Sequence, residues 1–262
     1  MESILFEETL NTILADYFAT FDIPVVSIRY SIVDDMAAAY KELCPDHAER
    51  EPQKIATLNQ YNGTTVSPSN VAGMFTILLN AKYMLESVNG NNANWVGTIA
   101  HETTHVVDFT DFATLLDAEN YEDILSIAKN SMFQLWTEFN ARAKGYYFVR
   151  KYSFEDMFDE SQISDIINIE IPEQEKLLSQ NYHATTDGFQ QAYLVSHYLG
   201  RLYALQQIFP VVFTDEQVKN LIPPNPWMYE WFLFLKSHSK LGAAYPVFKE
   251  MKNILRKNFH GL

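Results

Sequence analysis

The chain has 262 residues, of which 47% are apolar, 14% aromatic and 20% charged. This composition is typical of a folded globular protein and excludes a disordered or low-complexity chain. With 19 Lys and Arg against 33 Asp and Glu, the formal net charge is −14. We therefore expect neither nucleic acid nor a membrane as a partner, because no broad basic face is available. The single cysteine, Cys44, excludes an internal disulfide and a cysteine-based zinc finger, and its thiol is expected to be buried.

The amino-terminal segment does not have the features of a signal peptide. Acidic residues interrupt its apolar positions, whereas a signal peptide has a basic start and a continuous apolar run. No window of about 18 uncharged apolar residues, the length needed to span a bilayer, occurs in the chain. We therefore expect a cytoplasmic protein.

The first 90 residues are predicted to alternate between helix and strand. Apolar residues with helical spacing indicate helices, and β-branched and aromatic runs indicate strands. In chain order, the predicted elements are a helix over 1–20, a strand over 24–33, a short helix over 35–43, a weaker strand over 54–61 and a buried or edge strand over 74–83.

Beyond about residue 92 almost every segment has helical periodicity. The predicted helices cover 92–112, 119–149, 172–181, 186–208, 214–221, 226–237 and 242–258. A small amino-terminal sheet followed by a larger helical part predicts an α+β fold. We expect one domain over residues 1–262, with a sheet-containing lobe over 1–90 and a mostly helical lobe over 91–262 that carries the functional site.

The motif that carries chemistry is His101-Glu102-Thr103-Thr104-His105. Two histidines four residues apart on a helix lie on the same face, so both rings can bind one metal ion. The glutamate between them is close enough to contact a water bound to that ion. This arrangement lets zinc lower the pKa of its water while a carboxylate accepts the proton.

The helix around this motif has two chemically different sides. One side is an apolar stripe, and the two histidines fall opposite it, beside Asp108. An amphipathic helix needs only one buried side, so the second, polar side favours a site over two chance surface histidines. The stripe consists of Val96, Ile99, Ala100, Thr103, Val106 and Val107.

A tetrahedral catalytic zinc site needs a third protein ligand, and two residues compete for that role. Asp111 lies ten residues after His101, but the turn that would bring it back needs a glycine where this chain has Asp108. Glu138 lies 33 residues after His105 in a strongly helical segment. It faces away from the apolar stripe of that segment, beside the small residues Ala141 and Gly145, which would let another helix approach closely. We therefore favour Glu138 over Asp111.

Both segments resemble the active-site helices of zincin metallopeptidases whose third ligand is a glutamate. HETTHVVDFTDF is similar to the first helix of thermolysin-like and anthrax-lethal-factor-like peptidases, and of short phage-associated intracellular relatives, and TEFNARAKGYYF is similar to their ligand-bearing helix. The resemblance implies a zincin-like fold in which His101, His105 and Glu138 bind Zn²⁺ and Glu102 is the general base. It also implies that residues 74–83 form the edge strand that aligns a peptide substrate.

Asp108 has two interpretations of equal weight. Lying one turn past His105, it could orient a ligand imidazole through the free N–H of the ring. It could equally be an ordinary residue near the end of the helix.

The sequence thus predicts a zinc metallopeptidase acting on a peptide or protein. Two alternatives remain: a zincin-like regulatory or toxin-associated protein that cleaves one partner or none, and a helical interaction protein without metal. Residues able to stabilise an oxyanion are not distinguished by sequence; they are Tyr146, Tyr147, Tyr182, His183, His197 and Tyr198.

Two further segments are predicted to be structural. The acidic run from Glu155 to Glu175 is expected to be a solvated surface segment. A later aromatic cluster is expected to lie in the core rather than in the wall of a pocket; it comprises Trp227, Tyr229, Trp231, Phe232 and Phe234.

Overall fold

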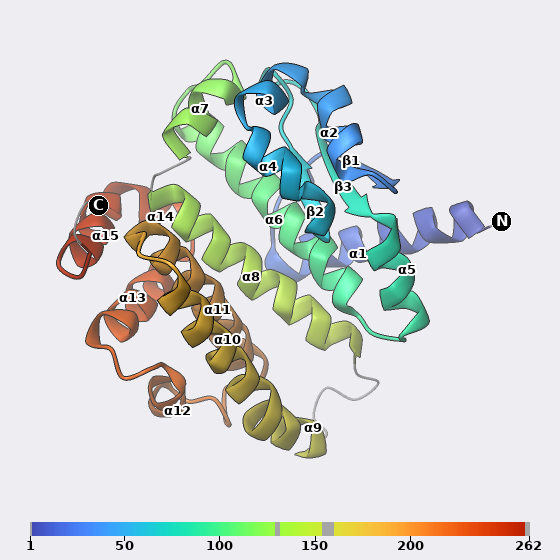
Figure 1. Cartoon of the computed structure of the whole chain (residues 1–262). Helices are drawn as coiled ribbons and strands as arrows, with labels where there is room; N and C mark the ends of the chain where they lie inside the picture. Colours follow the sequence, from blue (N-terminus) through green and yellow to red (C-terminus); the bar gives the residue numbers. More distant parts are fainter. Residues whose placement is uncertain (1, 129–131, 154–159, 260–262) are drawn as a thin grey trace.

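A three-stranded sheet and its surrounding short helices form the amino-terminal part of the protein, as seen in a computed structural model that describes residues 2–128, 132–153 and 160–259 (Figure 1). The α+β class is confirmed. The elements are α1 (Glu2–Phe21), β1 (Ile28–Val33), α2 (Met36–Leu43), α3 (Pro45–Arg50), α4 (Pro52–Thr57), a 3-10 turn (Leu58–Gln60), β2 (Gly63–Val66), β3 (Phe75–Asn80) and α5 (Ala81–Asn89).

Helices make up the rest of the described chain. They are α6 (Asn94–Leu115), α7 (Tyr121–Ala128), α8 (Met132–Ser153), α9 (Glu160–Asp165), a π-helical turn (Ile166–Glu170), α10 (Ile171–Ala184), α11 (Gly188–Ile208), α12 (Asp215–Leu221), α13 (Pro226–Ser237), α14 (Leu241–Ala244), a 3-10 turn (Tyr245–Val247) and α15 (Phe248–Arg256). The predicted helix over 119–149 is in fact α7 and α8, and residues 129–131 lie outside the described residues. None of the helices in the described part of the chain combines the length and the apolar composition needed to cross a bilayer.

The strand order is β1-β3-β2, so β3 is the central strand. It pairs in parallel with β1, Ile28 opposite Phe75, and antiparallel with β2, Gly63 opposite Leu79. The apolar run of β3 is buried on both faces because helices cover the sheet. Of the two alternatives predicted for residues 74–83, the buried strand is confirmed over Phe75–Asn80, and the edge strand that the resemblance implies is wrong. The edge on the α6 side is β2, and Asn80 ends β3 by capping α5.

The predicted strand over 54–61 is also wrong. These residues form α4 and the 3-10 turn, and the strand comes later as β2. Ile55 and Leu58 are the buried residues of this segment, and a spacing of three is helical rather than alternating. Pro52 at the first position of α4 is a favourable helix start.

Three long helices, α6, α8 and α11, form the centre of the molecule (Figure 1). α8 packs against α6 on one side and α11 on the other, and these are the two most extensive helix contacts. The apolar stripe predicted for α6 is buried, from Val96 to Val107. The aromatic cluster on α13 is likewise core, since Trp227, Trp231 and Phe232 are buried.

Two predictions about exposure need correction. Cys44 is only half-buried, because it lies at the junction of α2 and α3 near the surface. The acidic run is only partly solvated. Ile166 and Ile171 are buried within it, and Glu170 accepts hydrogen bonds from α8; residues 154–159 lie outside the described residues.

Candidate metal centre

Helix α6 presents His101 and His105 on the face opposite its buried apolar stripe. The four-residue spacing places the two rings one above the other, and their Nε2 atoms lie 3.1 Å apart. Burial holds the pKa of His101 well below its usual range, so this ring is neutral and its nitrogen can accept a cation. Two ring nitrogens at this distance could bind the same metal ion.

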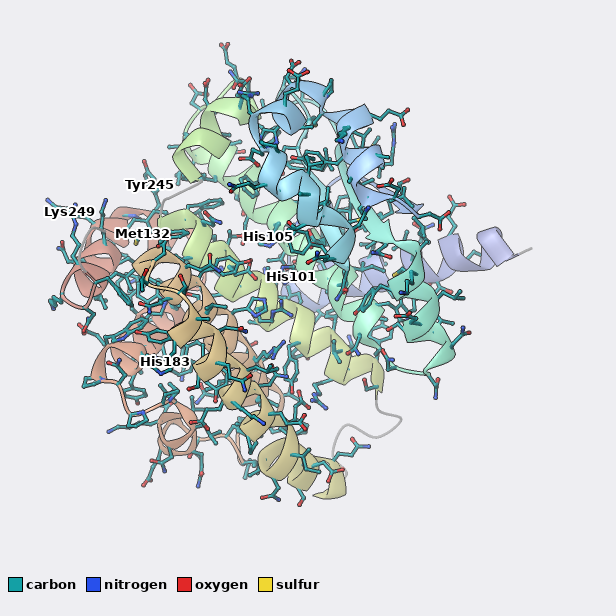
Figure 2. All side chains as sticks on the ribbon, in the orientation of Figure 1. His101, His105, Met132, His183, Tyr245 and Lys249 are labelled. Atoms are coloured by element: carbon teal, nitrogen blue, oxygen red, sulfur yellow. The ribbon has the colours of Figure 1, made fainter. Side chains whose placement is uncertain are left out.

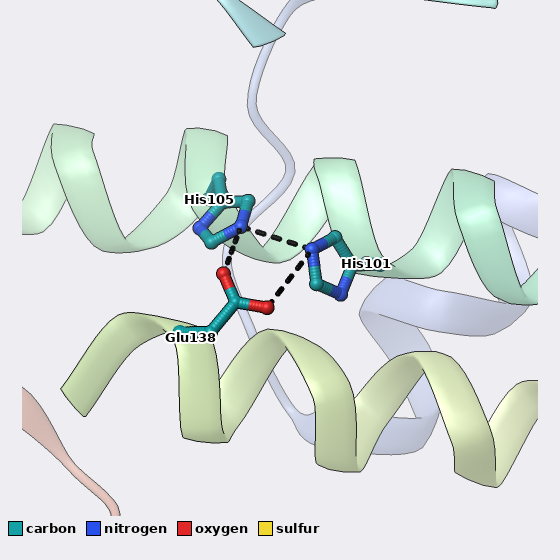
Figure 3. A group of neighbouring side chains, drawn as sticks. All are labelled: His101, His105 and Glu138. Atoms are coloured by element: carbon teal, nitrogen blue, oxygen red, sulfur yellow. Dashed lines mark hydrogen bonds and ion pairs between the residues drawn. The ribbon is translucent and has the colours of Figure 1, made fainter. Parts of the chain in front are cut away.

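Glu138 completes the group from α8 (Figure 3). One carboxylate oxygen lies 3.7 Å from His101 Nε2 and the other lies 3.6 Å from His105 Nε2. The donor atoms of the three residues all lie within 4.8 Å of one another. Burial opposes ionisation of Glu138, but the neighbouring imidazoles outweigh it and hold the pKa of this carboxyl well below its usual range.

These spacings can be compared with what a metal ion requires. Tetrahedral zinc bonds of about 2.0–2.1 Å put two ligand atoms about 3.3 Å apart. The two Nε2 atoms are 3.1 Å apart, and each lies 3.6 or 3.7 Å from the nearer of the two Glu138 oxygens. These separations lie on both sides of that value. Two imidazoles and one carboxylate are the donor set of catalytic zinc sites that keep one position open. The three residues could therefore hold a metal ion, and their donor set is one that zinc accepts.

Two glycines allow α6 and α8 to come this close. A Cβ added at Gly145 would lie 2.8 Å from the carbonyl oxygen of Gly97 and 3.1 Å from His101 Cβ. A Cβ at Gly97 would in turn lie 2.9 Å from the carbonyl oxygen of Gly145. Both helices thus approach through bare backbone one or two turns from the ligands, which is the role expected of the small residues near Glu138.

Asp108 supports His105 through an intermediate side chain. The Thr137 hydroxyl donates to Asp108 Oδ2 at 2.7 Å, and it lies 3.1 Å from His105 Nδ1. Because the hydroxyl proton points to the carboxylate, Thr137 accepts from Nδ1–H, which leaves Nε2 as the ring nitrogen that faces a metal. The Glu138 carboxylate outweighs burial and raises the pKa of His105, so a bound metal would take the place of the Nε2 proton. Burial raises the pKa of Asp108 to about 6. This geometry is compatible with the predicted role of Asp108 in orienting a ligand imidazole, which Asp108 would do through Thr137.

His101, His105 and Glu138 are called the ligand group below. Glu102 lies beside this group and is buried, with 8% of its surface exposed. Its carboxylate accepts a hydrogen bond from the Thr65 hydroxyl at 2.8 Å, which joins α6 to the edge strand β2. Burial raises the pKa of Glu102, opposed by the charges of His105 and Lys54 and by the Thr65 hydrogen bond. A buried carboxyl with a raised pKa is suited to accept and release a proton near neutral pH.

Helix α11 adds a second group of side chains. His197 Nε2 lies 3.1 Å from a Glu138 oxygen and accepts a hydrogen bond from Arg142. The Tyr193 hydroxyl, one turn earlier, lies beside Glu138, and burial together with this carboxylate raises the pKa of Tyr193. Burial first, and then Arg142, lower the pKa of His197 to about 4. His197 was one of six equal candidates from the sequence, and Tyr193 was not among them. The i, i+4 spacing of these two residues was the available signal.

Apart from Tyr146, the remaining candidates from the sequence lie away from His101, His105 and Glu138. Asp111 is exposed on α6 and is not in the ligand group, and its charged neighbour is Lys144. His183 on α10 lies apart from His101 and His105 (Figure 2). The Tyr198 hydroxyl donates to the backbone of Leu221, and the rings of Tyr147 and Phe21 are in contact. Tyr182 contacts His183 on α10, whereas Tyr146 faces the cavity.

The ligand group opens into a cavity of about 1100 Å³. Strand β2 forms one wall through Gly63, Thr64 and Thr65, and α11 forms the opposite wall. His101, Glu102, His105 and Glu138 all line it. The cavity is large enough for several residues of a peptide, and the ligand group lies between its two walls.

Comparison with known proteins finds no similarity that identifies a family. No family model matches the chain, and no curated protein and no solved structure matches it.

Proposed function

We propose that the chain is a zinc-dependent peptidase. One observation carries this proposal: three metal-ligating atoms converge beside a buried glutamate within a large cavity. His101, His105 and Glu138 would hold the ion. When bound, zinc supplies a Lewis acid that polarises a substrate carbonyl and acidifies water.

Glu102 would act as the general base in this reaction. It would take the proton from the attacking water and pass it to the leaving amine, and the Thr65 hydroxyl would hold the carboxylate in place. The Tyr193 hydroxyl, beside Glu138, is a neutral donor available to the oxyanion that forms on the substrate. Glu102 comes from α6 and Tyr193 from α11.

The edge strand β2 would align the substrate. Its pairing with β3 uses only one of its two edges among the described residues, and Gly63 to Thr65 line the cavity. An extended peptide binds such an edge through main-chain hydrogen bonds, which are independent of the side chains of the substrate. The proposed substrate is therefore an extended segment of a peptide or protein.

Replacing Glu102 by Gln tests this proposal. The variant keeps the shape and the Thr65 contact but cannot accept a proton, so we expect it to bind zinc normally and to lose cleavage about a hundredfold or more. Cleavage would be measured by mass spectrometry on a random-sequence peptide library and on unfolded casein. Glu42→Gln, an exposed substitution on α2, is the matched control.

Two results would contradict the proposal. Zinc-loaded wild type that cleaves neither substrate would favour a metal-binding protein without peptidase activity. Equal cleavage by wild type and the Glu102→Gln variant would remove Glu102 from the chemistry.

A further inference from the structure

Arginine side chains occupy one end of the metal-bearing cavity. Arg142 follows Glu138 by one turn of α8, and Arg201 follows His197 by one turn of α11. A third arginine, Arg150, lies two turns further along α8, and all three line the cavity. The end of the cavity beyond His197 is therefore basic, although the whole chain has a formal net charge of −14.

The three arginines differ in what neutralises them. Arg150 forms an ion pair with Glu170 and also donates to the Tyr146 hydroxyl. Arg142 donates to the neutral ring of His197. Arg201 has no ion pair with any carboxylate in the described part of the chain, and its charged neighbours are the other two arginines. The Nε atoms of Arg142 and Arg201 are both buried without a hydrogen-bond partner among the described residues.

The carboxylates of the cavity compensate this charge only in part. The charges of Glu138 and Glu102 act on Arg142, whereas the neighbours of Arg201 are Arg142, Arg150 and two tyrosines. Glu138 faces the two metal-ligating histidines, Glu102 accepts from Thr65, and Glu170 is held by Arg150 and Tyr146. Burial of a guanidinium is costly unless an anion is beside it. Burial, with a further effect of Arg142, lowers the pKa of Arg201 to about 10, which reflects the same cost. Arg201, an enclosed guanidinium with no ion pair in the described part of the chain, lies near Arg142, which shares Glu138 with two histidines. Such an arrangement is typical of a site whose anion comes from a ligand.

We propose that Arg142 and Arg201 bind a carboxylate of the substrate, so that the substrate class is a peptide with an acidic group close to the cleaved bond. This inference rests on the proposed peptidase function. The carboxylate is either an Asp or Glu side chain or the carboxyl terminus of the peptide, because both present the same two oxygens to a guanidinium.

The helix geometry limits where this carboxylate lies. One four-residue step along α8 advances about 6 Å, which separates Arg142 from the level of Glu138. An extended peptide advances about 3.3 Å per residue. For an extended peptide that runs parallel to α8, the acidic group therefore lies about two residues from the cleaved bond.

A binding experiment tests the anion site without using catalysis. Titration calorimetry would measure hippurate, a small carboxylate, and its uncharged amide on the full-length chain, both as purified and after EDTA treatment. We expect hippurate to bind and the amide to bind at least about tenfold more weakly, with or without EDTA, because a charge-assisted hydrogen bond is lost. Arg201→Met should weaken hippurate binding by about ten- to hundredfold, whereas Arg29→Met, at an exposed position of β1, should not.

A cleavage experiment identifies the source of the carboxylate. One peptide library would be prepared in two forms, with free and with amidated carboxyl termini, and digested by the zinc-loaded wild type. Loss of cleavage on amidation indicates recognition of the terminus. Cleavage of amidated peptides only where Asp or Glu lies about two residues from the bond indicates recognition of a side chain, and either result supports the proposal.

Failure of this inference is distinguishable from failure of the peptidase proposal. Cleavage without preference for any carboxylate, together with equal binding of hippurate and its amide to the wild type, overturns the arginine site and leaves the peptidase intact. Hippurate binding that depends on Arg201, in a protein that cleaves nothing, supports the anion site and contradicts the peptidase. The comparison of hippurate with its amide needs no variant, so it stands even if Arg201→Met does not fold.

Discussion

The Thr137 hydroxyl connects His105 to Asp108 and thereby orients the His105 ring toward the metal site. Replacing Thr137 by Val removes both contacts while keeping the volume of the side chain. We expect zinc affinity to fall about ten- to hundredfold, the usual loss when a residue that orients a metal ligand is removed. Competition with a chromophoric chelator would measure this, with Thr114→Val, an exposed substitution on α6, as the control. Equal affinities of the Thr137→Val variant and the wild type would show that the relay has no role.

Asp108 makes the stability of the metal-free protein depend on pH. Its pKa is about 6 in the folded protein and about 3.9 when unfolded, so the folded state binds the proton more tightly. This contribution is fully present below about pH 4 and is lost as the pH rises through 6. The free energy of unfolding of the wild type should therefore fall by about 2 kcal/mol relative to Asp108→Asn between pH 4 and pH 7. Urea unfolding at several pH values would measure it, and parallel profiles would contradict the assignment.

At the residue scale, sequence predicts contacts within a helix better than contacts between helices. His101 and His105 were identified because a spacing of four on one helix fixes their relative position. Glu138 was predicted only because small residues near it would let another helix come close, and α6 does come closest to α8 at one of them, Gly145. Tyr193 and Arg201 were missed, because α11 reaches the site only through its packing on α8.

The approach of α6 to α8 depends on Gly145. Replacing it by Ala places a methyl group 2.8 Å from a backbone oxygen of α6, which cannot move as a side chain can. We expect the two helices to separate by a few tenths of an ångström, with a loss of about 1–3 kcal/mol in unfolding free energy and weaker zinc binding. Gly242→Ala is a matched control, since its added Cβ meets nothing within 4 Å. Unchanged stability and zinc affinity in Gly145→Ala would mean that the contact is looser than described.

At the scale of elements, helices with strong periodicity were predicted well and short elements were not. The prediction of 92–112 corresponds closely to α6 (Asn94–Leu115). The strand predicted over 54–61 was wrong because a short segment with few apolar residues fits more than one periodicity, and β2 has only four residues. The central position of β3 is set by pairing with segments on either side of it, which no local pattern encodes.

At the scale of the whole molecule, the ligand group joins the two helices that contact each other most extensively. His101 and His105 come from α6 and Glu138 from α8, so a bound ion would cross-link the centre of the fold. Binding to the native state alone stabilises a protein in proportion to the logarithm of ligand concentration. Zinc bound at the proposed site would therefore stabilise the packing of α6 on α8 in addition to its role in the reaction.

Metal content measured by inductively coupled plasma mass spectrometry tests this central claim most directly. Untagged wild type would be compared with Glu138→Ala and with Asp111→Ala, which removes a carboxylate from the same motif helix but outside the ligand group. We expect about one zinc per chain in the wild type and in Asp111→Ala, and a loss of zinc in Glu138→Ala, because removing one of three protein ligands leaves too few. Wild type that contains no metal even after zinc is supplied, or Glu138→Ala that retains a full equivalent, would contradict the account.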